Sequence, residues 1–229
     1  MSKESVLNTG KAYFFSMASE RELRVRLAKV GHLLHREGLT SGTSGNISVR
    51  LPERNLCLIK PSGYHLADLN PEDFLILNIE TRKKLGGKGN PRTETPFHTH
   101  LYNIREDADS IVHVHAHYTT VLSLFNLKIK PYTTNICETP GLTRGISTAE
   151  FALPGTEELA QNLGKALHGF DAAVMPHHGI TTVGETPENA ALKAVVVERM
   201  AKIQYHALLL GEPDKIPDQL VEHLKNLKK

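Results

Sequence analysis

The chain has 229 residues, of which 40% are hydrophobic and 23% charged, which is ordinary for a soluble globular protein. The formal net charge is +2, and no run of Lys and Arg interleaves with aromatic residues, so nucleic-acid binding is not expected. No apolar run approaches the roughly 20 residues of a membrane helix, and we expect no signal peptide. Two cysteines are too few for a disulfide scaffold and predict a reducing, cytoplasmic location.

The first third of the chain predicts a helix followed by short strands and polar turns. Ser19 is a predicted N-cap, and apolar residues recur at helical spacing as far as Arg36: Leu23, Leu27, Val30 and Leu34. Strands are predicted from Ile47, at 56–59 and at 74–79, with a flexible loop at 86–90. The turns at 42–46 and 60–64 carry glycines and hydroxyl groups. They are either plain turns or, side by side at one sheet end, a shared phosphate site.

The rest of the chain alternates helices and strands. Thr95 is the predicted N-cap of a helix that runs to about Arg105, with Phe97, Leu101 and Ile104 on its apolar face. Further helices are predicted at 118–125, 156–168 and 187–210, and strands at 111–117, 172–175 and 180–183, with a loop-rich stretch at 126–155 and a partly ordered tail. In the last helix we expect five residues to be buried: Leu192, Val195, Val196, Met200 and Ile203. A single α/β domain over residues 1–229, with a mostly antiparallel sheet, fits this order.

Two histidine clusters are the strongest chemical signal. His113 and His115 lie on one face of a predicted strand, because side chains in a strand alternate with period two. Such a pair alone is more often packed or solvated than metal-bound, but the second cluster, His177-His178-Gly179, can complete a site. Three histidines with an open position are typical of catalytic zinc. Glu94, just before a helix, is either a solvated acid or the base of this site.

The motifs Gly42–Asn46, Pro61–Gly63, Thr93–Glu94, His113-x-His115 and His178–Gly179, in this order, resemble the class II aldolase/adducin-head family over residues 20–210. The resemblance implies a three-layer α/β/α sandwich with a mostly antiparallel central sheet. It implies a homotetramer with active sites at subunit interfaces. It also implies one Zn²⁺ per subunit, replaceable by Mn²⁺ or Co²⁺, with four ligands: His113, His115, His178 and Glu94. The implied substrate and phosphate contacts are Thr43, Gly45, Asn46, Ser62, Gly63, Arg92 and Thr93.

The implied activity is a zinc-dependent aldolase that cleaves a ketose 1-phosphate to dihydroxyacetone phosphate and an aldehyde through a metal-stabilised enediolate. Glu94 would move the proton. The sequence departs from the family pattern at two places. Arg92-Thr93 stands where its aldolases commonly carry paired serines, and Arg92 can bind either a phosphate or a carboxylate. Tyr132 lies near, but not in register with, the tyrosine acid of the fuculose-phosphate enzymes, and we name it as the candidate acid.

Other activities remain open within the same resemblance. The same fold supports a decarboxylase, an epimerase or a dehydratase that acts on a sugar phosphate or a keto acid. A non-catalytic, adducin-like scaffold is the alternative of another class. A scaffold predicts lost metal ligands, whereas this chain keeps all three histidines and Glu94.

Overall fold

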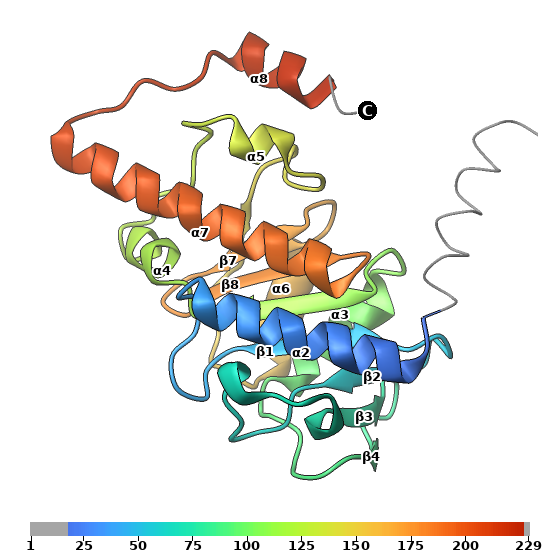
Figure 1. The fold of residues 1–229 in the computed structure, drawn as a ribbon. Helices are drawn as coiled ribbons and strands as arrows, with labels where there is room; N and C mark the ends of the chain where they lie inside the picture. The colour runs from blue at the N-terminus through green and yellow to red at the C-terminus, as the bar shows by residue number, and fades with distance from the viewer. Residues whose placement is uncertain (1–17, 227–229) are drawn as a thin grey trace, which may run out of the picture.

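The structure, a computed structural model, describes residues 18–226 and is built around one eight-stranded sheet (Figure 1). The strand order is β4-β3-β2-β1-β5-β8-β7-β6, and all neighbours are antiparallel except β6 and β7. The strands are β1 (Asn46–Arg50), β2 (Leu56–Ile59), β3 (Leu75–Asn78), β4 (Lys84–Gly86), β5 (Ser110–Val114), β6 (Ser147–Thr148), β7 (Ala172–Met175) and β8 (Gly179–Gly184). The predicted α/β fold with a mostly antiparallel sheet is thus confirmed.

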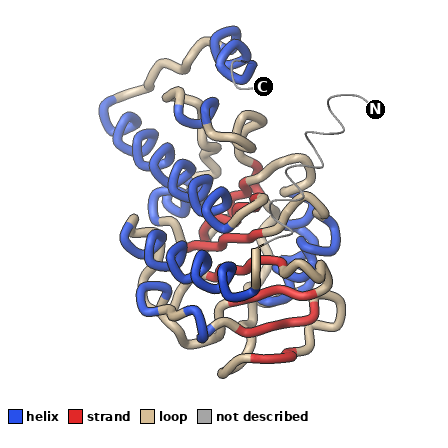
Figure 2. Tube along the Cα trace, turned by 45° about the vertical axis from the view of Figure 1, so that its right-hand side comes forward, coloured by secondary structure: helices blue, strands red, loops and turns tan. Residues whose placement is uncertain are grey.

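Helices cover both faces of the sheet (Figure 2). One core cluster lies between the sheet and α2 (Glu20–Arg36), α4 (His117–Leu124) and α7 (Pro187–Leu210). It continues beyond the sheet into α5 (Asn135–Glu138), which packs on α7, and α8 (Asp218–Asn226), which packs on α5. The other cluster lies between the sheet and α3 (Thr95–Ile104) and α6 (Glu157–Ala166). Short 3₁₀ helices at Leu66–Asp68 and Pro71–Asp73 link β2 to β3. None of the helices in the described part of the chain could cross a bilayer.

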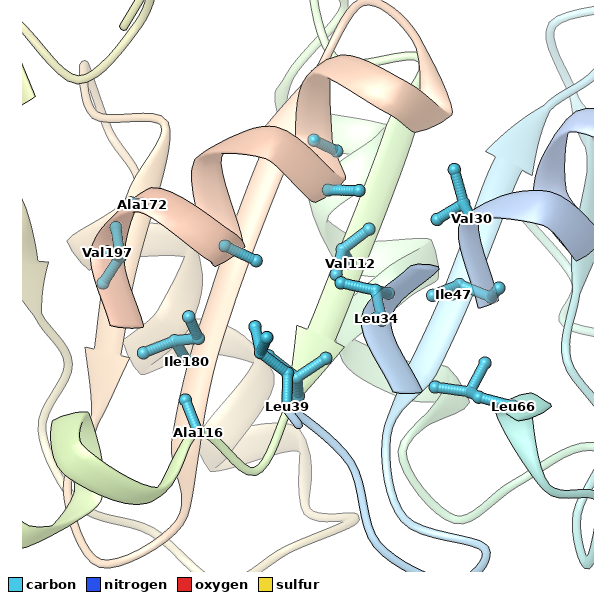
Figure 3. Close-up of a cluster of buried hydrophobic side chains, with 14 of the residues drawn as sticks. Val30, Leu34, Leu39, Ile47, Leu66, Val112, Ala116, Ala172, Ile180 and Val197 are labelled. Atoms are coloured by element: carbon cyan, nitrogen blue, oxygen red, sulfur yellow. The ribbon is translucent and has the colours of Figure 1, made fainter. Parts of the chain in front are cut away.

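Strand β5 occupies the middle of the sheet and shows why its sequence alternates. Val112 and Val114 are fully buried in the core under α2 and α7, where Figure 3 shows Val112 near Leu34. Ile111 packs in the opposite core, and His113 shares its face of the strand. Burying a valine or isoleucine stabilises the fold by about 1.5–3 kcal/mol, so this alternation fixes which face the histidine takes.

The buried face of α7 differs from the predicted one. Leu192 is 48% exposed and Ile203 39% exposed, Val195 and Val196 are half-buried, and Met200 is buried as predicted. The face against the sheet carries smaller residues: Ala190, Ala191, Ala194, Val197 and Ala201. Small side chains are required because the helix lies close to β8. A Cβ added to Gly184 would come within 2.7 Å of the backbone nitrogen of Ala190.

Local details also differ from the expectations. Glu94, not Thr95, occupies the N-cap position of α3, without a side-chain cap, and Thr95 is the first helical residue. Ile104 is 48% exposed rather than on the apolar face. His115 lies one residue beyond β5. Three regular elements form in segments predicted as loop or tail: α5, β6 and α8. Strand β4 forms just before the predicted loop at 86–90 and includes its first residue.

Candidate metal centre

Glu94, His113, His115 and His178, hereafter the metal centre, come together from separate parts of the chain. Each offers one ligand atom, and these atoms all lie within 4.8 Å of one another. The ring centroids are 5.1 Å apart for His113 and His115, 4.7 Å for His113 and His178, and 4.9 Å for His115 and His178. The predicted convergence of two histidine clusters and one carboxylate is therefore present in the fold.

The pairing of β5 with β8 brings the second cluster to the first. Val114 lies opposite Ile180 in this antiparallel pair, so the turn before β8 reaches the end of β5. His178, in that turn, donates its N–H to the carbonyl of Met175 at 3.1 Å. A Cβ on Gly179 would lie 2.2 Å from the carbonyl oxygen of Val114, which leaves no room for a side chain. Glycine at this position thus lets His178 approach His115.

We expect Gly179→Ala to move His178 away from the metal centre and to destabilise the protein. Forcing one extra carbon into a packed site costs about 1–3 kcal/mol in free energy of unfolding. Chemical denaturation and metal titration would measure both effects. Gly86→Ala, on the edge strand β4, is the matched control, because its added Cβ meets nothing closer than 3.4 Å. Equal stability and metal affinity for the two variants would contradict the prediction.

The hydrogen bonding of His113 leaves one ring nitrogen ready for a cation. Its Nδ1 lies 3.0 Å from the carbonyl oxygen of Ile180, which can only accept, so Nδ1 carries the proton. Nε2 is fully buried, has no hydrogen-bond partner in the described structure, lies 3.5 Å from Oε1 of Glu94, and is the ring nitrogen that a cation could take. A ligating histidine commonly donates its other N–H to a carbonyl in this way. The residues therefore fit a divalent cation.

The charge states of the metal centre also suit a cation. Burial raises the pKa of Glu94, but its interactions with His113 and His178 outweigh this and hold the pKa well below its usual range. Its Oε1 lies 3.0 Å from Nε2 of His178, and its Oε2 accepts from the amide nitrogen of Asn46 at 2.6 Å. Burial, together with His113 and His178, lowers the pKa of His115 to about 4, so its ring is neutral at pH 7. Neutral imidazoles and an ionised carboxylate are the forms that bind metals.

Two basic side chains support the turn at 42–46, beside the metal centre. Lys60 is fully buried and donates to the carbonyl of Thr43 at 2.9 Å, and Arg92 donates to the same oxygen at 2.6 Å. Burial and then the charge of Arg92 lower the pKa of Lys60 to about 7, although Glu94 opposes the shift. Sequence analysis missed Lys60. A lysine that ends a buried apolar strand just before a polar turn was the available signal.

The predicted substrate residues fall into three groups. The first group is exposed and lies on the turns that the hydrogen bonds of Lys60 and Arg92 connect. Its members are Thr43, Ser62, Gly63 and Thr93. Gly45 and Asn46 are buried, Gly45 at a positive φ of 79° and Asn46 against Glu94. Tyr132 lies between α4 and α5, in a segment whose backbone hydrogen-bonds Gln204 of α7. Within the described chain, no hydrogen bond or ring contact joins Tyr132 to the metal centre.

Known proteins resemble this chain in both sequence and fold. A family model described as Class II Aldolase and Adducin N-terminal domain matches residues 25–205. A 5-methylthioribulose-1-phosphate/5-deoxyribulose-1-phosphate aldolase of Rhodospirillum rubrum is 33% identical over 82% of this chain and 82% of its own. A 3-oxo-tetronate 4-phosphate decarboxylase of Escherichia coli O6:H1 is 28% identical over 84% and 89%. The solved structure of an L-fuculose 1-phosphate aldolase matches with a TM-score of 0.81 and 33% identity, covering 92% of this chain and 97% of that one.

Proposed function

The chain belongs to the Class II Aldolase and Adducin N-terminal domain family, and on this premise we propose that it cleaves a ketose 1-phosphate to dihydroxyacetone phosphate and an aldehyde. The chain is an enzyme of the class II aldolase type. The observation that carries the substrate proposal is the complete metal centre beside a turn backed by the basic side chains of Arg92 and Lys60. A non-catalytic scaffold would be expected to have lost ligands, and none of the four is lost.

We propose Zn²⁺ as the ion, one per subunit, because three imidazoles and a carboxylate are typical zinc donors. Mn²⁺ and Co²⁺ accept the same donors. When bound, such an ion supplies a Lewis acid that withdraws charge from the hydroxyl and carbonyl oxygens of the substrate. His113, His115 and His178 would hold it, and Glu94 would be the fourth ligand until substrate arrives.

Glu94 is the residue we assign to proton movement. Its carboxylate is ionised and buried, and Asn46 holds one oxygen while the other faces the histidines. It can therefore accept a proton from a bound hydroxyl or carbon acid and return it to the carbon left by the departing aldehyde. Tyr132 remains the proposed acid for the aldehyde oxygen in the reverse direction, where condensation turns that oxygen into a hydroxyl group. With no contact to the metal centre of its own chain, it would act at the site of a neighbouring subunit in the proposed homotetramer.

We propose that the substrate phosphate lies on the turns that carry Thr43, Ser62, Gly63 and Thr93. Their backbone and hydroxyl groups are exposed. The guanidinium of Arg92 lies behind them, together with the amine of Lys60, whose charged form a bound phosphate would favour. Gly45 shapes the turn through its positive φ. For Asn46 the structure supports contact with Glu94, and the predicted contact with phosphate stays a prediction.

Lys60→Met is expected to raise KM for the phosphorylated substrate more than it changes kcat. Methionine removes the amine behind the turn and the donor that holds the carbonyl of Thr43. A loss of about 1.5–3 kcal/mol in phosphate binding, the contribution of one charge-assisted hydrogen bond, corresponds to about 10- to 100-fold. Steady-state kinetics and inhibition by inorganic phosphate would measure the change. Lys84→Met is the matched control, because Lys84 also donates to a carbonyl, that of Gly89, but is exposed. An unchanged KM and phosphate inhibition constant would remove Lys60 from the phosphate site.

The second candidate is a decarboxylase, and Arg92 is the observation that favours it. Its side chain is 16% exposed, and its Nε lies 3.9 Å from Oε2 of Glu94, so it could bind a substrate carboxylate at the edge of the metal centre. Epimerase and dehydratase activities would use the same residues.

The cytoplasmic location and the single domain over the whole chain also remain proposals.

A substrate panel with metal-loaded protein would test these proposals. We expect release of dihydroxyacetone phosphate from a ketose 1-phosphate, abolished by a chelator and restored by Zn²⁺. Release of CO₂ from a phosphorylated keto acid would select the decarboxylase. If no ketose phosphate in a broad panel is cleaved, the aldolase proposal is wrong.

A further inference from the structure

A row of buried polar side chains joins β1 to the helix α3 and runs away from the metal centre. The strand β1 contributes Asn46, Ser48 and Arg50. The helix α3 and its N-cap contribute Glu94, His98 and Tyr102, and all six side chains are at most 7% exposed. Two residues along a strand span about 6.6 Å, and four along a helix about 6 Å, so successive partners remain opposite. Polar groups in such an interface are costly to bury. We call these six residues the β1–α3 polar row.

Hydrogen bonds connect the members of the row. Asn46 donates to Glu94 at 2.6 Å, as described above. The hydroxyl oxygen of Ser48 lies 2.7 Å from Nδ1 of His98 and 2.7 Å from the hydroxyl of Tyr102. Arg50 donates to the carbonyl of Tyr102 at 2.7 Å, and its guanidinium lies over the same ring. The row thus begins at the metal centre and ends at Arg50.

The protons in the middle of the row can be assigned. Burial raises the pKa of Tyr102 well above its ordinary value, so its hydroxyl keeps its proton, and we assign Ser48 as the acceptor of that proton because it is the hydrogen-bond partner of this hydroxyl in the described structure. Ser48 has one hydroxyl hydrogen, which we assign to the bond with Nδ1 of His98, its other partner. Burial and then the nearby His113 lower the pKa of His98 to about 3, so its ring is neutral. The single ring proton of His98 is therefore on Nε2.

Three atoms of the row are buried without a hydrogen-bond partner in the described structure: Nε of Arg50 at the far end, and a complementary pair nearer the metal centre. The pair consists of Nε2 of His98 and Oδ1 of Asn46. The proton assignment makes the first a donor, and the second can only accept. Their residues stand on neighbouring steps of the row. Buried polar groups of this kind are usually paired by ordered water.

We propose that one buried water joins Nε2–H of His98 to the carboxamide oxygen of Asn46, which makes His98 a positioning residue for Glu94. The link fixes the Asn46 amide with its oxygen toward His98 and its NH₂ toward the carboxylate. Without it, the amide can turn and present its oxygen to Glu94, where two acceptors repel. His98 would therefore act on the orientation of Glu94 without touching substrate or metal.

The first test needs no assay of activity. In protein labelled with ¹⁵N-histidine, we expect the His98 ring to show the neutral Nε2–H tautomer with slow solvent exchange. The resonance is assigned by its loss in His98→Gln. A high-resolution crystal structure should show a water between His98 and Asn46. An Nδ1–H tautomer, an imidazolium at pH 7, or ordered density without that water would overturn the proposal.

The second test is kinetic and rests on the proposed function. Misplacement of a catalytic group can cost about 10- to 100-fold, so we expect His98→Leu to lower kcat by this factor while KM and metal content hold. His98→Gln, whose amide NH₂ can replace the donor, should restore most of kcat. In a Glu94→Gln background, His98→Leu should cause no further loss.

Equal losses of kcat in the Leu and Gln variants, or a further loss in the Glu94→Gln background, would assign His98 a purely structural role and overturn the proposal. Absence of any aldolase activity in the wild-type protein would instead count against the proposed function. The tautomer and water measurements on the wild-type protein would still decide the role of His98.

Discussion

Glu94→Gln is expected to lower kcat for ketose phosphate cleavage by about 10²- to 10⁴-fold, the usual contribution of a positioned acid–base group. Glutamine keeps the shape of the side chain, and its carbonyl oxygen can still accept from Asn46, which holds Oε2 of Glu94 at 2.6 Å. It cannot take up and return a proton. The loss should therefore appear in kcat, measured at saturating metal and substrate.

Glu80→Gln is the matched control for this variant, because Glu80 is an exposed carboxylate in the turn after β3. It should leave kcat unchanged. Elemental analysis of both proteins separates a catalytic effect from loss of metal, since the three histidines remain in place. A Glu94→Gln protein that is fully metal-loaded and keeps half of its kcat or more would exclude Glu94 as the group that moves the proton.

His178→Ala is expected to remove most of the metal affinity, and with it the activity. Mutation of a residue that only orients a metal ligand already lowers metal affinity by about 10- to 100-fold. Loss of a ligand itself should therefore lower the affinity by at least about 100-fold. Metal that binds only the folded protein stabilises it by about 2.7 kcal/mol at 100 times Kd. Added Zn²⁺ should therefore raise the Tm of the wild-type protein but not that of His178→Ala.

His177→Asn is the matched control, one residue away. His177 is exposed and has a positive φ of 61°, a conformation that asparagine tolerates, and its backbone N–H donates to Ser123 at 3.2 Å whatever the side chain. It should bind Zn²⁺ and gain stability as the wild-type protein does. If both variants lose metal affinity equally, the turn as a whole, rather than the His178 ligand, is responsible.

Much of the fold follows from local patterns in the sequence. Ser19 and Glu22 form the capping box that starts α2, and Thr156 caps α6 as predicted. The alternation around His113 predicts which face of β5 carries the histidine. These features depend on neighbours in the sequence, so a reading of spacing and residue type captures them.

The wrong prediction for the buried face of α7 shows what residue spacing along one helix cannot predict. Large apolar residues at helical spacing predicted burial of Leu192 and Ile203, but the distance between helix and sheet decides which side chains fit between them. Alanines line that contact because β8 is close, and the larger residues turn outward. The separation of two layers is a property of the assembled fold, and hydrophobic spacing along one helix does not contain it.

The residues of the candidate site also divide into those that the sequence predicts and those that it does not. His113, His115, His178 and Glu94 could be named because metal ligands have a limited range of residue types and spacings. Lys60 and His98 could not, because each acquires its role through a partner far along the chain. Lys60 reaches Thr43, 17 residues away, and His98 reaches Ser48, 50 residues away.

The two outer strands of the sheet bear on how copies of this protein meet in a crowded solution. The outer strands are β4, with three residues, and β6, with two. Long exposed edges invite another chain to add a strand and so to aggregate, whereas edges this short offer few free backbone groups. We therefore expect the folded protein to resist growth into fibrils through its sheet, and we expect the proposed homotetramer to form through other surfaces.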